Sequence, residues 1–158
     1  MPFAIILGCS DSRVPIEIIF DRFLGDLFVL RIAGNVVATS QIGSIEFALH
    51  HFKTPLIVVL GHSHCGAINA SLDECREPTP ETDSIHRITS LICPVICKFV
   101  GQNLPKKKLE KLSIEANVNN SIKRLKNNSQ IIQNRLTDNK LKIVGASYSL
   151  RTRKVHFL

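Results

Sequence analysis

The sequence predicts an α/β fold: a mostly parallel four-stranded sheet with helices on both faces and an antiparallel strand at one edge. Two short apolar runs rich in Ile and Val end at Gly8 and Gly61, and such runs are typical of buried parallel strands. Between the expected strands lie longer segments in which apolar residues recur with helical spacing. A length of 158 residues suits one domain, predicted to span 1–158, and we see neither an internal repeat nor a linker.

The first half of the chain is expected to form two strands, each followed by a helix. The strands are residues 3–7 and 27–32, and residues 33–35 form the turn after the second. Polar residues 10–12 are of helix-capping type, and Pro15 fits a first helical turn. The apolar face of the first helix would comprise Ile16, Ile19, Phe20 and Phe23. The second helix would begin at Thr39 or Ser40, with Ile42, Ile45, Phe47 and Leu49 as its buried side.

The second half is expected to be mainly helical between two further strand regions. Residues 55–60 predict the third strand, 67–72 a helix, and 76–83 an exposed loop containing two prolines. Three helices should follow, from Ser84 to near Val100, from about Lys107 to Lys126, and from about Ser129 to Leu136. The middle one carries an apolar stripe of Leu109, Leu112, Ala116, Ile122 and Leu125. Residues 141–147 predict the fourth strand and 155–158 the antiparallel edge strand.

Candidate metal ligands follow two of these strands. Cys9 comes directly after the first strand, and His62 and Cys65 come directly after the third. Ligands in open α/β sheets bind beyond the carboxyl ends of the strands, so these three side chains should meet. Two thiols and one imidazole form a zinc set of the catalytic kind, with a fourth position open.

These motifs resemble those of the beta-class carbonic anhydrases. The resemblance rests on Cys9-x-Asp11-x-Arg13 and on His62-x-x-Cys65-Gly66. It continues through residues 25–31, 33–35, 44–48 and 145–148, and so covers nearly the whole chain. It implies a zinc enzyme that hydrates carbon dioxide reversibly to bicarbonate and a proton. It also implies a homodimer, or a multiple of dimers, with the site at the subunit boundary.

The predicted zinc ligands affect the acidity of metal-bound water, and this gives Asp11 and Arg13 an expected role. Two thiolates and a neutral imidazole cancel the charge of Zn²⁺, so bound water should be less acidic than in a three-histidine site. The resemblance implies that Asp11, kept ionised by Arg13, accepts a hydrogen bond in the reaction. It also implies that Asp11 can become a fourth zinc ligand in a closed state. The alternative is that Asp11 only caps the first helix. His64 is expected at the solvent-facing rim.

The composition of the chain indicates its compartment, the state of its thiols and the partners that it does not bind. Five cysteines in a chain with no visible signal peptide predict a cytoplasmic protein with metal binding and free thiols rather than disulfides. Cys93 and Cys97 are expected to be small buried hydrophobes, against the alternative of a redox pair. Residues 98–158 carry fourteen Lys or Arg against three Asp or Glu, but without interleaved aromatics. We therefore expect no specific nucleic-acid partner, and no apolar run is long enough for a membrane span.

Two other functions share these features. A related fold could hydrolyse carbon disulfide or carbonyl sulfide, and a non-catalytic remnant could bind zinc and present a basic surface. The resemblance also implies an N-terminal helical arm, whereas the sequence begins almost at the first strand. We therefore expect a short form that associates through its zinc-site face, with lower stability and activity than a form carrying the arm.

Overall fold

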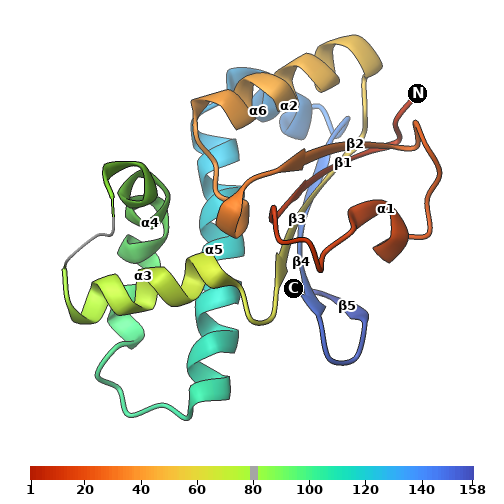
Figure 1. Cartoon of the computed structure of the whole chain (residues 1–158). Helices are drawn as coiled ribbons and strands as arrows, with labels where there is room; N and C mark the ends of the chain where they lie inside the picture. Colours follow the sequence, from red (N-terminus) through yellow and green to blue (C-terminus); the bar gives the residue numbers. More distant parts are fainter. Residues whose placement is uncertain (79–81) are drawn as a thin grey trace.

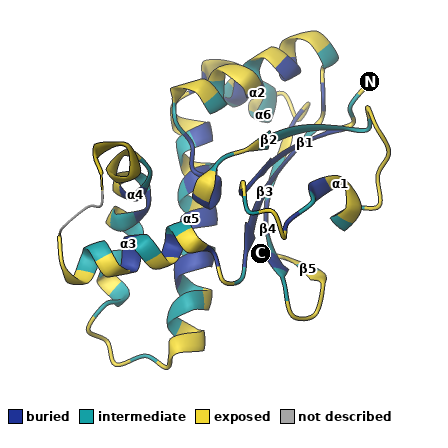
Figure 2. Cartoon of the chain, in the orientation of Figure 1, coloured by how far each residue is buried: buried dark blue, intermediate teal, exposed yellow. Residues whose placement is uncertain are grey.

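The computed structural model describes residues 1–78 and 82–158, and it has one five-stranded sheet (Figure 1). The strands are β1 (Ala4–Gly8), β2 (Leu27–Arg31), β3 (Leu56–His62), β4 (Lys142–Ser149) and β5 (Lys154–Phe157). Their order is β2-β1-β3-β4-β5; the first four are parallel, and β5 is antiparallel at the edge. The predicted sheet is thus confirmed. β1 and β3 are buried along almost their whole length (Figure 2).

The helices are distributed unequally over the two faces of the sheet. They are α1 (Ile16–Ile19), α2 (Thr39–Phe52), α3 (Gly66–Arg76), α4 (Asp83–Ile96), α5 (Lys106–Asn127) and α6 (Gln130–Thr137), with 3₁₀ turns η1 (Ala33–Asn35) and η2 (Cys97–Phe99). α2, α5 and α6 share one core with the face that carries Ile5 and Ile57. The opposite face, with Ile6 and Val58, packs against the segment around α1. None of the described helices is long and apolar enough to span a bilayer.

Two glycines let α5 lie directly on the sheet. A β-carbon on Gly61, in β3, would lie 2.8 Å from Val118 Cγ2 and 2.9 Å from Ile114 Cγ2. A β-carbon on Gly145, in β4, would lie 2.9 Å from Val118 Cγ1. Real β-carbons do not approach so closely, so any larger residue at either position would push α5 away from the strands. This close packing fixes α5 beside the end of β3.

α3 and α4 form a separate layer on the outer side of α5 (Figure 1). Ile68 and Leu72 of α3 and Ile92 and Ile96 of α4 are buried together in a third core, which also contains Ile114 of α5. The predicted loop 76–83 joins the two helices, and its residues 79–81 lie outside the described part of the chain. This third core reaches the cysteines at the ends of β1 and β3.

Two predictions about helix faces were wrong, and the apolar stripe predicted for α5 was incomplete. The first helix has only four residues and begins after Pro15, and Phe23 is 83% exposed rather than part of an apolar face. Phe47 of α2 is 53% exposed. In α5 the buried positions include Ser113, Asn117 and Ser121 rather than a purely apolar stripe. Periodicity alone could not reveal that Asn117 and Ser121 have hydrogen-bond partners across the core.

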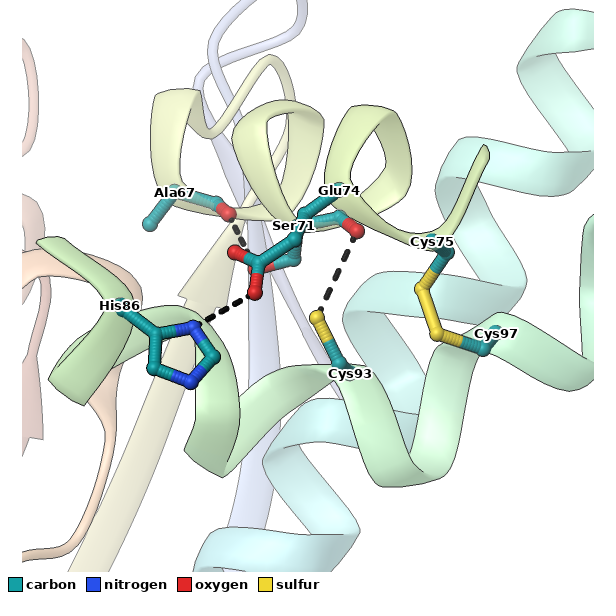
Figure 3. The surroundings of a disulfide bond; sticks show 7 residues. All are labelled: Ala67, Ser71, Glu74, Cys75, His86, Cys93 and Cys97. Atoms are coloured by element: carbon teal, nitrogen blue, oxygen red, sulfur yellow. Dashed lines mark hydrogen bonds and ion pairs between the residues drawn. A yellow bond between two sulfur atoms is a disulfide. The ribbon is translucent and has the colours of Figure 1, made fainter. Parts of the chain in front are cut away.

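The prediction of free thiols throughout was also wrong. Cys75 at the end of α3 and Cys97 after α4 form a disulfide, with their Cα atoms 5.2 Å apart (Figure 3). Both residues are half-buried, so Cys97 is not the buried small hydrophobe that we expected. The pairing arises because α3 and α4 run side by side, which brings together residues 22 positions apart. Cys9, Cys65 and Cys93 remain free thiols.

Candidate metal and catalytic site

Cys9, His62 and Cys65 meet at the carboxyl ends of β1 and β3. Cys9 follows β1, His62 ends β3, and Cys65 is the N-cap residue of α3. Their ligand atoms lie within 4.8 Å of one another, and all three residues are buried. β1 and β3 are neighbouring parallel strands, so their carboxyl ends lie at the same edge of the sheet. The structure therefore brings together the three residues that the sequence singled out.

The histidine ring has one nitrogen occupied and one available. His62 Nδ1 lies 2.9 Å from the carbonyl oxygen of Ser63 and donates to it as an N–H. Nε2 is buried and has no hydrogen-bond partner among the described residues. A carbonyl bond to one nitrogen fixes the tautomer, which leaves the lone pair of the other nitrogen for a metal. This orphaned atom, together with two thiols, fits a zinc ion.

The two cysteines of the group have unlike charge states. A hydrogen bond from the Cys65 thiol is the main cause that lowers the pKa of Cys9 to about 4, against the effect of burial, and the neighbouring His62 ring and the backbone of Asp11 and Gly34 add to it. The same contact with Cys9, together with burial, raises the pKa of Cys65. Burial lowers the pKa of His62, but Cys9, the Ser63 carbonyl and Asp11 together raise it above its ordinary value. The group thus favours a negatively charged sulfur at Cys9, which suits the binding of a cation.

Asp11 is held by Arg13 through two parallel hydrogen bonds. Arg13 Nε donates to Asp11 Oδ1 at 2.9 Å, and Nη2 donates to Oδ2 at 2.7 Å. The backbone N–H of Arg13 also donates to Oδ1 at 2.9 Å. The hydrogen bonds from Arg13 hold the pKa of Asp11 well below its usual range. Asp11 therefore stays ionised throughout the physiological range.

The helix-cap alternative for Asp11 is wrong. α1 begins at Ile16, its N-cap residue is Pro15, and no side chain caps it. Instead, the Asp11 side chain binds the N–H two residues on, which closes an Asx turn. In the described part of the chain Asp11 is not a member of the metal-ligand group, and its carboxylate faces Arg13.

Arg31 supports the same loop, and the sequence analysis gave it no role. Its Nε donates to the Cys9 carbonyl at 2.9 Å, and its Nη2 donates to the Asp11 carbonyl at 2.5 Å. Arg31 ends β2 and pairs in register with Gly8, the residue before Cys9. A basic residue at the carboxyl end of a strand next to β1 was the available signal.

A contact from α5 holds the loop between His62 and Cys65. The carboxylate of Glu110 accepts a hydrogen bond from the His64 backbone N–H and lies 3.3 Å from His64 Nδ1. His64 has a φ of 56°, a conformation that most side chains avoid, so the contact fixes a strained turn. The predicted rim position of His64 agrees with its side chain being 65% exposed. Nothing in the sequence marked Glu110 among the lysines near it.

Buried polar residues of α5 fix the turn η1 behind Cys9. Asn117 Nδ2 donates to the Gly34 carbonyl at 2.7 Å, and Ser121 Oγ donates to the Asn35 carbonyl at 2.9 Å. Gly34 and Asn35 both have positive φ, at 65° and 44°; glycine adopts this conformation readily, whereas for Asn35 it is uncommon, and the hydrogen bonds from α5 help to hold it. Because the Gly34 backbone hydrogen-bonds to Cys9, α5 contributes indirectly to the metal-ligand group.

Comparisons with known proteins agree with this site. A family profile described as carbonic anhydrase matches residues 4–155. Carbonic anhydrase 2 of Mycobacterium tuberculosis is 38% identical, over 94% of this chain and 70% of that protein. A carbonic anhydrase of Mycolicibacterium smegmatis is 37% identical, over 98% of this chain and 73% of its own length.

Solved structures show the same fold. The beta-carbonic anhydrase CcaA aligns with a TM-score of 0.87 and 25% identity, over 99% of this chain and 77% of that one. A Coccomyxa beta-carbonic anhydrase in complex with acetazolamide aligns with a TM-score of 0.85 and 26% identity, over 99% of this chain and 72% of that one. Fold and site thus define an α/β enzyme with a cysteine–histidine group at the sheet edge. The chain belongs to the beta-class carbonic anhydrases, and so to the carbonate dehydratases.

Proposed function

We propose that this chain is a zinc-dependent carbonic anhydrase that hydrates carbon dioxide reversibly to bicarbonate and a proton. One observation carries the proposal. A buried Cys9–His62–Cys65 group with an orphaned imidazole nitrogen lies beside an aspartate held ionised by an arginine. Family membership supports the same reaction.

Cys9, His62 and Cys65 would hold the metal. Zinc bound there supplies a Lewis acid that makes water acidic enough to act as a nucleophile near neutral pH. The protein prepares the ligands for this task in two ways. The Ser63 carbonyl orients the His62 ring, and backbone groups of Ala67 and Ile68, at the start of α3, hydrogen-bond to Cys65.

Asp11 would act as the ionised hydrogen-bond acceptor that orients the attacking water toward carbon dioxide. Arg13 keeps this carboxylate charged and fixes both of its oxygens, so that its direction is set before substrate arrives. Arg31 holds the backbone on either side of the same turn. The proton released would pass to buffer, and we assign no side chain to that step.

A stopped-flow assay of carbon dioxide hydration on the zinc-loaded protein tests the proposal. Wild type should be active, and Asp11→Asn should retain zinc but lose most of its activity, because an amide is no anionic acceptor. Asp138→Asn is a matched control, since Asp138 is an exposed residue that follows α6. Zinc-loaded wild type that does not hydrate carbon dioxide, whether or not it hydrolyses carbon disulfide, would refute the proposal.

We also propose that the working unit is a homodimer or a multiple of dimers. Ile18, Phe23 and Leu24 are 78%, 83% and 100% exposed on the segment that joins β1 to β2. Clustered apolar side chains of this kind favour burial against another surface. Native mass measurement should give at least twice the chain mass of 17.6 kDa, and a monomer at assay concentration would contradict this.

A further inference from the structure

A second cluster of thiol groups lies on α3 and α4, away from the sheet edge (Figure 3). The sulfur atoms of Cys75, Cys93 and Cys97 lie within 4.8 Å of one another. Cys75 and Cys97 form the disulfide, and Cys93 is a free thiol beside them. All three residues are half-buried, so reductants and ions in solution can reach them. The proposed carbonic anhydrase chemistry uses none of them.

The packing of α3 against α4 fixes the positions of the three cysteines. Cys93 and Cys97 are four residues apart at the end of α4, so they lie on one face of the helix. Cys75, in the last turn of α3, lies opposite them. The Cys93 thiol donates to the Ser71 carbonyl at 3.5 Å, one turn before Cys75. The packed helices α3 and α4, with the 3₁₀ turn η2 that directly follows α4, therefore hold the three sulfur atoms.

A half-buried carboxylate lies beside the cluster. Glu74 precedes Cys75, and its side chain is only 13% exposed. Its Oε1 lies 2.6 Å from His86 Nδ1 of α4. A carboxylate in this position favours a cation over an anion.

We propose that Cys75, Cys93 and Cys97 form a second metal site, closed as a disulfide under oxidising conditions and able, once reduced, to bind one thiophilic d¹⁰ cation such as Zn²⁺. Thiolates select ions of this class. Zinc–sulfur bonds of about 2.3 Å in tetrahedral geometry place sulfur atoms about 3.8 Å apart. Breaking the Cys75–Cys97 bond lets these two sulfur atoms move apart toward that distance, and Cys93 Sγ already lies within 4.8 Å of both. Water would complete the coordination.

Opening the disulfide requires an external two-electron reductant. A dithiol supplies two electrons and two protons, the Cys75–Cys97 bond breaks to give two thiols, and the dithiol becomes a disulfide. A phosphine supplies the two electrons and becomes a phosphine oxide, with the oxygen and the two protons taken from water. The cation then replaces the protons of three thiols, which pass to buffer. With the disulfide intact only Cys93 can coordinate, and a single thiol holds zinc weakly. Redox state therefore determines whether the site exists.

Counting zinc per chain tests this site separately from the catalytic one. Zinc-equilibrated protein is prepared in an oxidised form and in a form reduced with a phosphine, and each is dialysed anaerobically before elemental analysis. Oxidised wild type should hold one zinc and reduced wild type two. Cys93→Ser keeps the disulfide pair but removes the third ligand, so its reduced form should hold one. Ser90→Ala, on the exposed side of α4, is the matched control and should hold two when reduced.

Removing a catalytic ligand separates the two proposals. Reduced Cys9→Ser should hold one zinc and oxidised Cys9→Ser none, whether or not the chain hydrates carbon dioxide. Equal zinc in oxidised and reduced wild type would overturn the inference. So would two zinc ions in reduced Cys93→Ser, or five free thiols in unfolded protein that had never been reduced.

Discussion

Arg13 joins the two loops that carry the candidate metal ligands. Its Nη2 lies 2.7 Å from Asp11 Oδ2, after β1, and 3.1 Å from the His64 carbonyl oxygen, after β3. Its Nε reaches the other carboxylate oxygen at 2.9 Å. One planar guanidinium therefore fixes the direction of Asp11 and the distance between the loops. A point charge could do only part of this.

Replacing Arg13 by lysine should impair hydration although the charge is conserved. Lysine cannot span both carboxylate oxygens and the His64 carbonyl, so we expect activity to fall on the order of tenfold or more, with zinc retained. Stopped-flow assays and zinc analysis would measure the two effects. Arg87→Lys, on an exposed part of α4, is the matched control. Activity in Arg13→Lys equal to that control would mean that charge alone suffices.

Cysteine substitutions should remove the catalytic metal. Cys9→Ser and Cys65→Ser each replace a soft thiolate by a hydroxyl that zinc binds poorly, so the oxidised proteins should lose their zinc. Cys93→Ser, outside the group, should retain it. Elemental analysis of the three variants decides the matter. Retention of a full equivalent in both Cys9→Ser and Cys65→Ser would place the metal elsewhere.

The Asp11–Arg13 pair should make stability depend on pH in acid. The hydrogen bonds from Arg13 lower the pKa of Asp11 in the folded state, so the pair stabilises the fold above the unfolded pKa of aspartate, about 3.9. This contribution is lost as the pH falls below that value toward the folded pKa. The difference in unfolding free energy between wild type and Asp11→Asn should therefore shrink below about pH 4. Urea titrations at several pH values would show it, and a difference constant with pH would contradict it.

The buried amide of α5 should matter more than its exposed neighbour. Asn117→Ala leaves the Gly34 carbonyl without its donor in a buried place, so we expect a loss of about 1–3 kcal/mol in stability. Asn119→Ala, on the exposed side of the same helix, should be within about 0.5 kcal/mol of wild type. Denaturant titration measures both. Because Gly34 supports Cys9, zinc affinity should also weaken in Asn117→Ala only.

Local patterns in the sequence predicted the sheet and the ligand group well. Runs such as residues 55–60 are apolar because both faces of a central parallel strand are covered, and the residues after such strands meet at one edge. Contacts between distant elements were harder to predict. Asparagine is a residue type that is common in loops. The burial of Asn117 is explained only by its hydrogen bond to the carbonyl of Gly34, 83 positions earlier. Glu110 likewise acts on a backbone atom of another element and has no sequence pattern to mark it, whereas the place of Arg31 at the end of a strand was a signal that the prediction did not use.

The disulfide shows a different limit. Whether Cys75 pairs with Cys93 or Cys97, or stays free, depends on the angle between α3 and α4 and on the turn η2 after α4. Cysteine count and compartment are statistical guides, and they favoured free thiols. The helix assignments themselves were accurate to a few residues in this region, so the error came from packing rather than from secondary structure.

Adding one methyl group at the contact between α5 and β3 should destabilise the protein and disturb the metal ligands. In Gly61→Ala the new β-carbon would lie 2.8–2.9 Å from Val118 and Ile114, so α5 or the strand must shift, at a cost of about 1–3 kcal/mol. Because Gly61 precedes His62, we also expect weaker zinc binding.

Gly43→Ala is the matched control for this substitution. Gly43 lies inside α2 with nothing within 4 Å of an added β-carbon, so alanine should stabilise the helix there by about 0.5–1 kcal/mol. Thermal unfolding and zinc titration of both variants would compare the two sites. If Gly61→Ala were as stable as Gly43→Ala and bound zinc normally, α5 would be free to move away from β3. That result would also contradict the support that α5 gives to Cys9 through Gly34.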